Sequence, residues 1–167
     1  MAQLPVGSGL VATGLGLFFC KVGVMHFQAE HIGEFVKIYP RYLPYAREAV
    51  LLTGVGEVLG GCLLLAGGFE ELVAGTSRFE RGKKFGALFL MHLVIWMSLA
   101  NIEMAINDRE IWGTRLSYRG PCMRLVAQVV LLTVLFRMSG TRHDHWAIVA
   151  SLGGMCLVAA IGHTRDR

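Results

Sequence analysis

Charged residues are scarce in this chain of 167 residues, because Asp, Glu, Lys and Arg together make up only 17% of it. Hydrophobic residues make up 54%, and the mean hydropathy is +0.52. Soluble domains carry about 25% charged residues, and runs of about 20 apolar residues are typical of membrane-spanning helices. The composition therefore argues against a soluble domain and predicts an all-α integral membrane protein, built as a bundle of transmembrane helices.

The chain also lacks a block of basic residues, although its net charge is +4. Its Lys and Arg residues are spread over the short segments between apolar runs, which is typical of anchoring at a membrane surface. This pattern excludes nucleic acid as a partner and favours membrane lipids. No basic segment precedes the first apolar run, and the run is not an Arg-rich amphipathic leader, so we expect it to be retained as a helix.

Motifs for metals and cofactors are absent as well. The four cysteines lie in four different apolar segments without C-x-x-C spacing, which favours a packing role and no metal site. A b-type haem needs two histidines at one depth, whereas His26 and His92 are expected about 20 Å apart in depth. We therefore predict no catalytic residues and no cofactor, with a quinone or a lipid as the conceivable bound ligand. The cysteines are Cys20, Cys62, Cys122 and Cys156.

The apolar runs predict four membrane-spanning helices and an added fifth one. Twelve residues separate the two arginines of the fourth run, which spans only if both reach outward. A short amphipathic segment that ends before Pro40 is too short to span, so we place it in the membrane interface. Residues 1–140 form the expected four-helix domain and residues 141–167 a C-terminal extension. The expected spans cover about residues 4–27, 47–69, 85–104, 124–137 and 146–163, and the interfacial helix covers residues 29–39. Residues 70–84 and 108–119 are expected to be polar connections.

Glu57 lies near the middle of the second apolar run, where a bare charge costs several kcal/mol. If successive helices alternate in direction, Lys21 lies about 9 Å and Glu57 about 15 Å below the same membrane face. Polar groups of four helices then gather in one half of the bilayer, and the opposite half has little but His92. The predicted cluster consists of Lys21, His26, Glu57, Asn101, Glu103, Arg124 and Gln128.

Two interpretations of this cluster stay open. It is either a satisfied network of hydrogen bonds that fixes helix packing, or the lining of a cavity for a lipid-soluble ligand with a polar head, such as a quinone. The first is favoured, because nothing in the sequence supplies a redox centre. Beside Glu57, Gly56-x-x-x-Gly60 and the following Gly61 predict a surface for close helix packing.

Four short motifs follow one another along the chain: Met25-His26-Phe27, Pro40 with Leu43-Pro44, Gly54-x-x-Glu57 with Gly60-Gly61, and Ala100-Asn101-Ile102 with Met104-Ala105. In this order and at these spacings they resemble DoxX-like membrane proteins. The resemblance covers about four-fifths of the chain and implies a membrane bundle of four helices, with His26, Glu57 and Asn101 at the family's recurring polar positions. It departs from the family at Leu99, where a proline is expected, and at Val126-Ala127, where Pro-Leu is expected.

These features lead to a functional expectation with one main alternative. We expect a non-catalytic accessory subunit of a larger membrane assembly, a respiratory-chain complex, with other membrane protein subunits as partners. The alternative, which follows the family's link to quinol oxidation, is a subunit of a quinone-linked oxidoreductase with Glu57 handling protons. A carrier of small solutes or lipids, with Glu57 as its coupling site, is disfavoured because no inverted repeat is visible. The expected location is the mitochondrial inner membrane, with the bacterial plasma membrane as the alternative.

Overall fold

The protein is described from a computed structural model, which covers residues 6–76, 78–107, 110–111, 114–115, 119–140 and 148–157. Within these ranges the chain forms six helices and one pair of two-residue antiparallel strands, so the all-α prediction is confirmed. The labelled elements are α1 (Val6–Met25), α2 (Ala29–Ile38), α3 (Ala46–Ala74), α4 (Glu80–Asn107), β1 (Glu110–Ile111), β2 (Thr114–Arg115) and α5 (Arg119–Ser139). The sixth helix is Ile148–Leu157.

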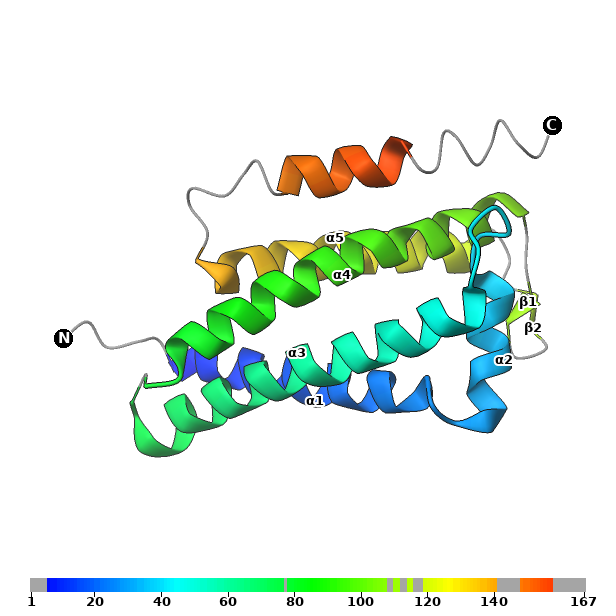
Figure 1. The fold of residues 1–167 in the computed structure, drawn as a ribbon. Helices are drawn as coiled ribbons and strands as arrows, with labels where there is room; N and C mark the ends of the chain where they lie inside the picture. Colours follow the sequence, from blue (N-terminus) through cyan, green and yellow to red (C-terminus); the bar gives the residue numbers. More distant parts are fainter. Residues whose placement is uncertain are drawn as a thin grey trace.

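Four long helices lie side by side, and the short helix α2 lies across one end of them (Figure 1). Helix α1 packs on α3, α3 on α4 and α4 on α5. Successive long helices run in opposite directions, so α1 and α4 end, and α3 and α5 begin, at the end covered by α2, here called the α2 end. The expected alternation in direction is therefore confirmed.

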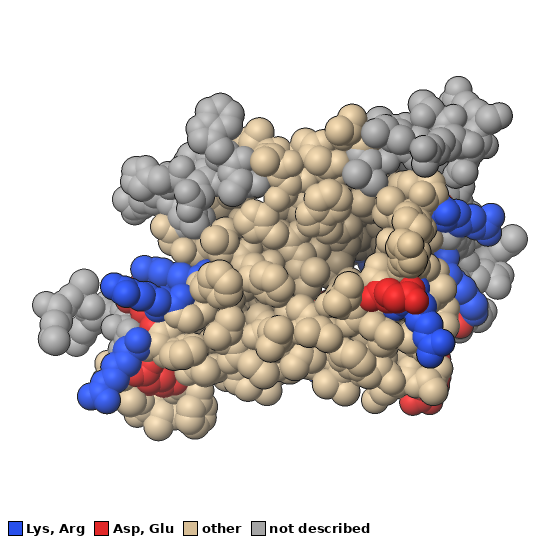
Figure 2. All heavy atoms as spheres, in the orientation of Figure 1, with Lys and Arg blue, Asp and Glu red and all other residues tan. Residues whose placement is uncertain are grey.

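Three helices of the described chain are long and apolar enough to cross a membrane, with spans at Ser8–Met25, Ala46–Ala74 and Glu80–Met104. On the face drawn in Figure 2, charged side chains gather at the two ends of the molecule and leave an uncharged middle. Both features are typical of a membrane protein. Helix α5 has 21 residues, about 30 Å, which matches the hydrocarbon core of a bilayer. Its crossing of the membrane stays a prediction.

The fifth expected span is described only in part. Helix Ile148–Leu157 is about 15 Å long and by itself too short to cross a bilayer, and the other residues of the expected span lie outside the described ranges. The helix lies along the bundle (Figure 1), with Ile148 and Met155 packed against the hydrophobic core. A Cβ built on Gly154 would lie 3.6 Å from the ring of Trp96 on α4.

The predicted polar connection over residues 70–84 is wrong in its extent, because the helices continue into it from both sides. Helix α3 ends at Ala74, with Gly75 at a φ of 60°, and α4 begins at Glu80. The carboxylate of Glu70 accepts hydrogen bonds from the Thr76 hydroxyl at 2.6 Å and from the Phe79 amide at 2.7 Å. These bonds hold the turn that leads into α4.

The extended helices also bury a charged cluster at the end opposite α2. Glu71 on α3 forms an ion pair with Lys83 on α4 and accepts a hydrogen bond from the Ser8 hydroxyl on α1. The side chains of Glu71 and Lys83 are 6% and 9% exposed. This end of the bundle, for which the sequence predicted little that is polar besides His92, thus holds a buried charge pair, because both helices continue into residues 70–84, which were expected to be a connection.

Helices α1 and α3 pack through glycines that recur every seven residues on each of them. A seven-residue spacing is close to two helical turns, so each set shares one helix face. The helices run in opposite directions, so the first glycine of one set faces the last of the other. A Cβ at Gly16 would lie 2.8 Å from the Gly61 carbonyl oxygen, and one at Gly23 would lie 2.8 Å from that of Gly54. The glycine seam consists of Gly9, Gly16 and Gly23 on α1 and Gly54, Gly61 and Gly68 on α3.

The predicted packing surface on α3 faces two neighbours. Gly56 and Gly60 face α4, where a Cβ on Gly60 would lie 2.5 Å from Leu90 Cγ. Gly61 belongs to the glycine seam, since a Cβ there would lie 2.9 Å from the backbone nitrogen of Cys20 on α1. Adjacent helix positions point about 100° apart, so Gly60 and Gly61 serve different helices.

Candidate ligand-binding site

His26 directly follows α1 and is held from two sides. Its imidazole stacks on the ring of Phe35 from α2, with centroids 4.0 Å apart and an interplanar angle of 5°. A Cβ built on Gly54 would lie only 2.6 Å from the His26 Cβ, so the end of the glycine seam leaves room for the histidine. His26 is 4% exposed and thus fixed within the bundle.

Glu57 faces His26 from α3. The His26 Nε2 atom lies 3.2 Å from Glu57 Oε2, and Glu57 is 1% exposed. The contact has ion-pair distance without the angles of a hydrogen bond, so among the described residues both imidazole nitrogens and Glu57 Oε2 are buried without a hydrogen-bond partner. Glu57 therefore contacts His26, but the two side chains can each form further hydrogen bonds.

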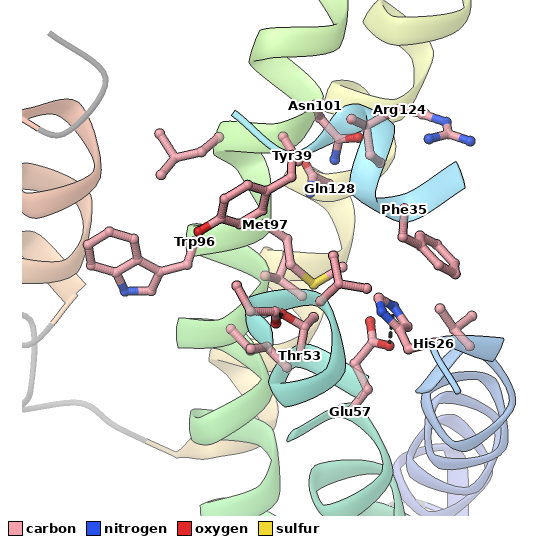
Figure 3. Close-up of a pocket in the computed structure, with 18 of the residues that line it drawn as sticks. His26, Phe35, Tyr39, Thr53, Glu57, Trp96, Met97, Asn101, Arg124 and Gln128 are labelled. Atoms are coloured by element: carbon pink, nitrogen blue, oxygen red, sulfur yellow. Dashed lines mark hydrogen bonds and ion pairs between the residues drawn. The ribbon is translucent and has the colours of Figure 1, made fainter. Parts of the chain in front are cut away.

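The pair borders a cavity of about 550 Å³ at the α2 end of the bundle. All five labelled helices contribute to its walls, which are mostly apolar. Figure 3 shows His26 and Glu57 on one side of it, and Asn101, Arg124 and Gln128 on another. A mostly apolar cavity of this size with a few convergent polar groups is typical of a small-molecule site.

The structure brings five of the seven predicted cluster residues together at this cavity. Lys21 is exposed on α1 and is not part of the lining, so His26 takes the place beside Glu57 that the lysine stem could have reached. Glu103 is 8% exposed on α4 and also lies outside the lining. Counting residues gives the depth of a side chain along its helix. It does not tell which neighbouring helix the side chain faces. The lining residues among those predicted are His26, Glu57, Asn101, Arg124 and Gln128.

Several lining residues were not predicted, above all those of α2. Phe35 and Tyr39 belong to the apolar face of the segment assigned to the membrane interface, but this face closes the cavity. The Tyr39 hydroxyl donates a hydrogen bond to the Pro44 carbonyl oxygen at 3.3 Å, and burial raises the pKa of Tyr39. Tyr39 thus stays a neutral donor near pH 7. The amphipathic pattern signals an apolar face but not whether lipid or protein covers it.

Chemically, the cavity can bind a polar group and exchange a proton with it. The imidazole can donate or accept a hydrogen bond, and the carboxylate accepts one from a hydroxyl or an amide. In the part of the chain that the structure describes, no three His, Cys, Asp or Glu side chains are grouped so that they could hold a metal ion.

Comparisons of the chain with protein-family models, with curated proteins and with solved structures found no match. The resemblance to DoxX-like proteins stays a prediction, and the function has to be argued from the site.

Proposed function

We propose that this chain is an integral membrane protein whose cavity binds a lipid-soluble molecule through a polar group held by His26 and Glu57. One observation carries the proposal: among the described residues, both imidazole nitrogens of His26 and Glu57 Oε2 are buried without a hydrogen-bond partner, beside a largely apolar cavity of about 550 Å³. A buried polar atom without a partner costs about 1–3 kcal/mol, so a ligand that completes these hydrogen bonds gains that free energy.

This proposal departs from the favoured interpretation of the sequence, a satisfied packing network. Such a network would have the polar atoms bonded to one another across the helices. Besides the His26–Glu57 pair, Gln128 Oε1 is also buried without a hydrogen-bond partner among the described residues. Polar atoms that lack hydrogen-bond partners thus lie on two walls of one cavity, and this arrangement supports the binding of a ligand between them.

A quinone is one ligand of the required chemistry. Its carbonyl oxygen accepts a hydrogen bond from the imidazole of His26, and the hydroxyl of its reduced form donates one to Glu57. The pair would exchange only the protons of the quinone, while an electron-transferring partner subunit would supply or take up the two electrons, in line with a quinone-linked oxidoreductase subunit. The resemblance to DoxX-like proteins, with their link to quinol oxidation and their bundle of four spanning helices, supports this class.

The test is to compare Glu57→Gln with Glu71→Gln after purification in a mild detergent. Both acids lie buried on α3 in an ion pair, but only Glu57 borders the cavity, so Glu71→Gln controls for the loss of a buried charge. Native mass spectrometry and extraction measure the bound lipid-soluble molecule. We expect Glu57→Gln to lower its occupancy about tenfold, the effect of one charge-assisted hydrogen bond, and Glu71→Gln to retain it. Equal occupancy in both variants, or no bound molecule in the unaltered protein, would contradict the proposal.

A second candidate function is that of a non-catalytic accessory subunit in a respiratory complex of the mitochondrial inner membrane, or of a bacterial plasma membrane. It is supported by helix Ile148–Leu157, which packs along the bundle with its inner side and leaves apolar residues outward. Its partly exposed apolar residues are Val149, Leu152 and Leu157, with exposed fractions of 53%, 41% and 61%, and the first two also border a groove between this helix and helices α4 and α5. They could pack on another membrane subunit.

Deleting residues 141–167 is expected to release the protein from its assembly while the four long helices stay folded. Native electrophoresis and mass spectrometry of the partners check this, with the triple change of Val149, Leu152 and Leu157 to alanine as a milder variant. If the shortened chain still migrates with the same partners, the extension is not the docking element.

A further inference from the structure

We propose that Cys20 on α1 and Cys62 on α3 form an oxidisable thiol pair, which a quinone dissolved in the membrane converts to a disulfide between the two helices. The two Sγ atoms lie 3.7 Å apart, although the cysteines are 42 positions apart in the chain. The sequence indicated only a packing role for them, because this neighbourhood arises in the fold. Neither cysteine borders the cavity, so the thiol pair is independent of what the cavity binds.

The backbones of α1 and α3 bring the two thiols together. Gly61 directly precedes Cys62, and a Cβ built on it would lie 2.9 Å from both the backbone nitrogen and the Sγ atom of Cys20. One turn before Cys20, a Cβ on Gly16 would lie 2.8 Å from the Gly61 carbonyl oxygen. The glycine seam therefore holds the two helices in close contact at the level of the thiol pair.

A disulfide needs only a small adjustment of this geometry. Its bond is about 2.05 Å long, so the two sulfur atoms have to approach by about 1.7 Å, which rotations about the Cα–Cβ bonds can supply. Two S–H bonds break and one S–S bond forms. The two electrons and two protons that leave the thiols reduce the two carbonyls of a quinone to the hydroxyls of a quinol, so atoms and electrons balance.

The depth of the thiol pair selects the class of oxidant. Cys62 lies 12 residues before the end of α3 at Ala74 and farther from its beginning, so it is about 18 Å from the nearer end of this apolar helix. Glutathione is charged and does not enter hydrocarbon, where a charge is costly. A quinone dissolves there. Cys62 is exposed, so a quinone in the lipid can reach it, while Cys20 is half-buried behind it.

The disulfide joins the two helices that carry His26 and Glu57. Cys20 lies six residues before His26, and Cys62 lies five residues after Glu57, so the link is about 8 Å along the helices from their contact. A covalent bond at this point prevents α1 and α3 from separating. Oxidation therefore fixes the position of His26 relative to Glu57.

The test uses the full chain with Cys122→Ser and Cys156→Ser, which leaves Cys20 and Cys62 as its two cysteines. The protein is reduced with dithiothreitol in nanodiscs, freed of the reductant and incubated without oxygen with duroquinone. This quinone carries a methyl group at every free ring position, so it oxidises thiols without alkylating them. Duroquinol is the control probe. Intact mass spectrometry, and labelling with a maleimide after unfolding, measure the thiols that remain.

We expect duroquinone to remove two hydrogen atoms from the chain and to abolish labelling of both cysteines, without forming dimers on non-reducing electrophoresis. Duroquinol should leave both thiols free, and dithiothreitol should restore them after oxidation. The oxidised protein should unfold at a higher concentration of sodium dodecyl sulfate than the reduced protein, because the link restricts the unfolded chain.

Cys62→Ala combined with Leu63→Cys is the matched control, because it moves the second thiol by one position to another side of α3. A Cβ built on Gly86 of α4 would lie 2.8 Å from the Leu63 Cβ, so position 63 faces α4 and not α1. This variant should retain both thiols under the conditions that oxidise the Cys20–Cys62 protein. Circular dichroism checks that the helices are retained.

Each other outcome would overturn a stated part of the proposal. Equal oxidation of the matched control would show that the contact between Cys20 and Cys62 is not what permits the reaction. Thiols that resist duroquinone but are lost with copper phenanthroline would overturn the quinone as oxidant, and resistance to both reagents, or linked dimers, would overturn the thiol pair. Ligand occupancy in Glu57→Gln is measured separately, so failure of the thiol pair leaves the proposed function to its own test.

Discussion

Gly16→Ala is expected to destabilise the protein by about 2–3 kcal/mol, the cost of forcing an extra carbon into a packed interior. The added Cβ would lie 2.6 Å from the Leu65 backbone nitrogen and 2.8 Å from the Gly61 carbonyl oxygen. These are backbone atoms of α3, so no side-chain rotation can relieve the contact and the two helices have to separate. Denaturation of the purified protein by sodium dodecyl sulfate, followed by circular dichroism, measures the change.

Gly14→Ala is the matched control, because it makes the same chemical change two residues earlier on α1. A Cβ at Gly14 meets nothing within 4 Å. Alanine is the better helix former by about 0.5–1 kcal/mol, so this variant should be as stable as the unaltered protein or slightly more stable. If both alanines had the same effect, close backbone contact at the glycine seam would not be what holds α1 to α3.

The second large effect concerns the buried pair. His26→Leu alone is expected to destabilise the protein by about 3–5 kcal/mol, because Glu57 then stays buried without its partner. Glu57→Leu alone should also be costly. The double variant His26→Leu/Glu57→Leu should lose much less than the sum of the two, since apolar side chains can replace a buried ion pair at little cost.

A double-mutant cycle over these variants measures the coupling free energy of the pair, which we expect to exceed about 2 kcal/mol. Glu57→Leu combined with Arg137→Gln serves as the control, because Arg137 is exposed at the far end of α5 and its effect should simply add. Additive losses for His26 and Glu57 would show that the contact of 3.2 Å contributes little to folding.

The glycine seam and the site around His26 and Glu57 were predictable from the sequence to different extents. The glycines of the seam recur every seven residues in each helix, a spacing that the predicted Gly-x-x-x-Gly surface does not include. The repeat could have indicated one close-packing face on each helix. That the two repeats meet head to tail depends on the antiparallel packing of α1 on α3.

For the candidate site, the sequence predicted the depth of each residue along its helix. Counting residues along alternating helices brought His26, Glu57, Asn101, Arg124 and Gln128 to one half of the bundle, and these residues do border one cavity. The same count included Lys21, which the fold leaves exposed. It also missed the pair of Glu71 and Lys83, because a segment rich in charges was taken for a loop although both helices run into it.

By itself, the sequence predicted an all-α protein with helices able to cross a membrane, and the approximate positions of the long helices. Hydropathy acts locally, so an apolar run near 20 residues long indicates a membrane helix wherever it packs. Only the tertiary structure decided that His26 is the partner of Glu57, that α2 closes the cavity and that Gly60 and Gly61 face different helices. Partners and cavities depend on the rotation of each helix about its axis, which is set by contacts between segments far apart in the chain.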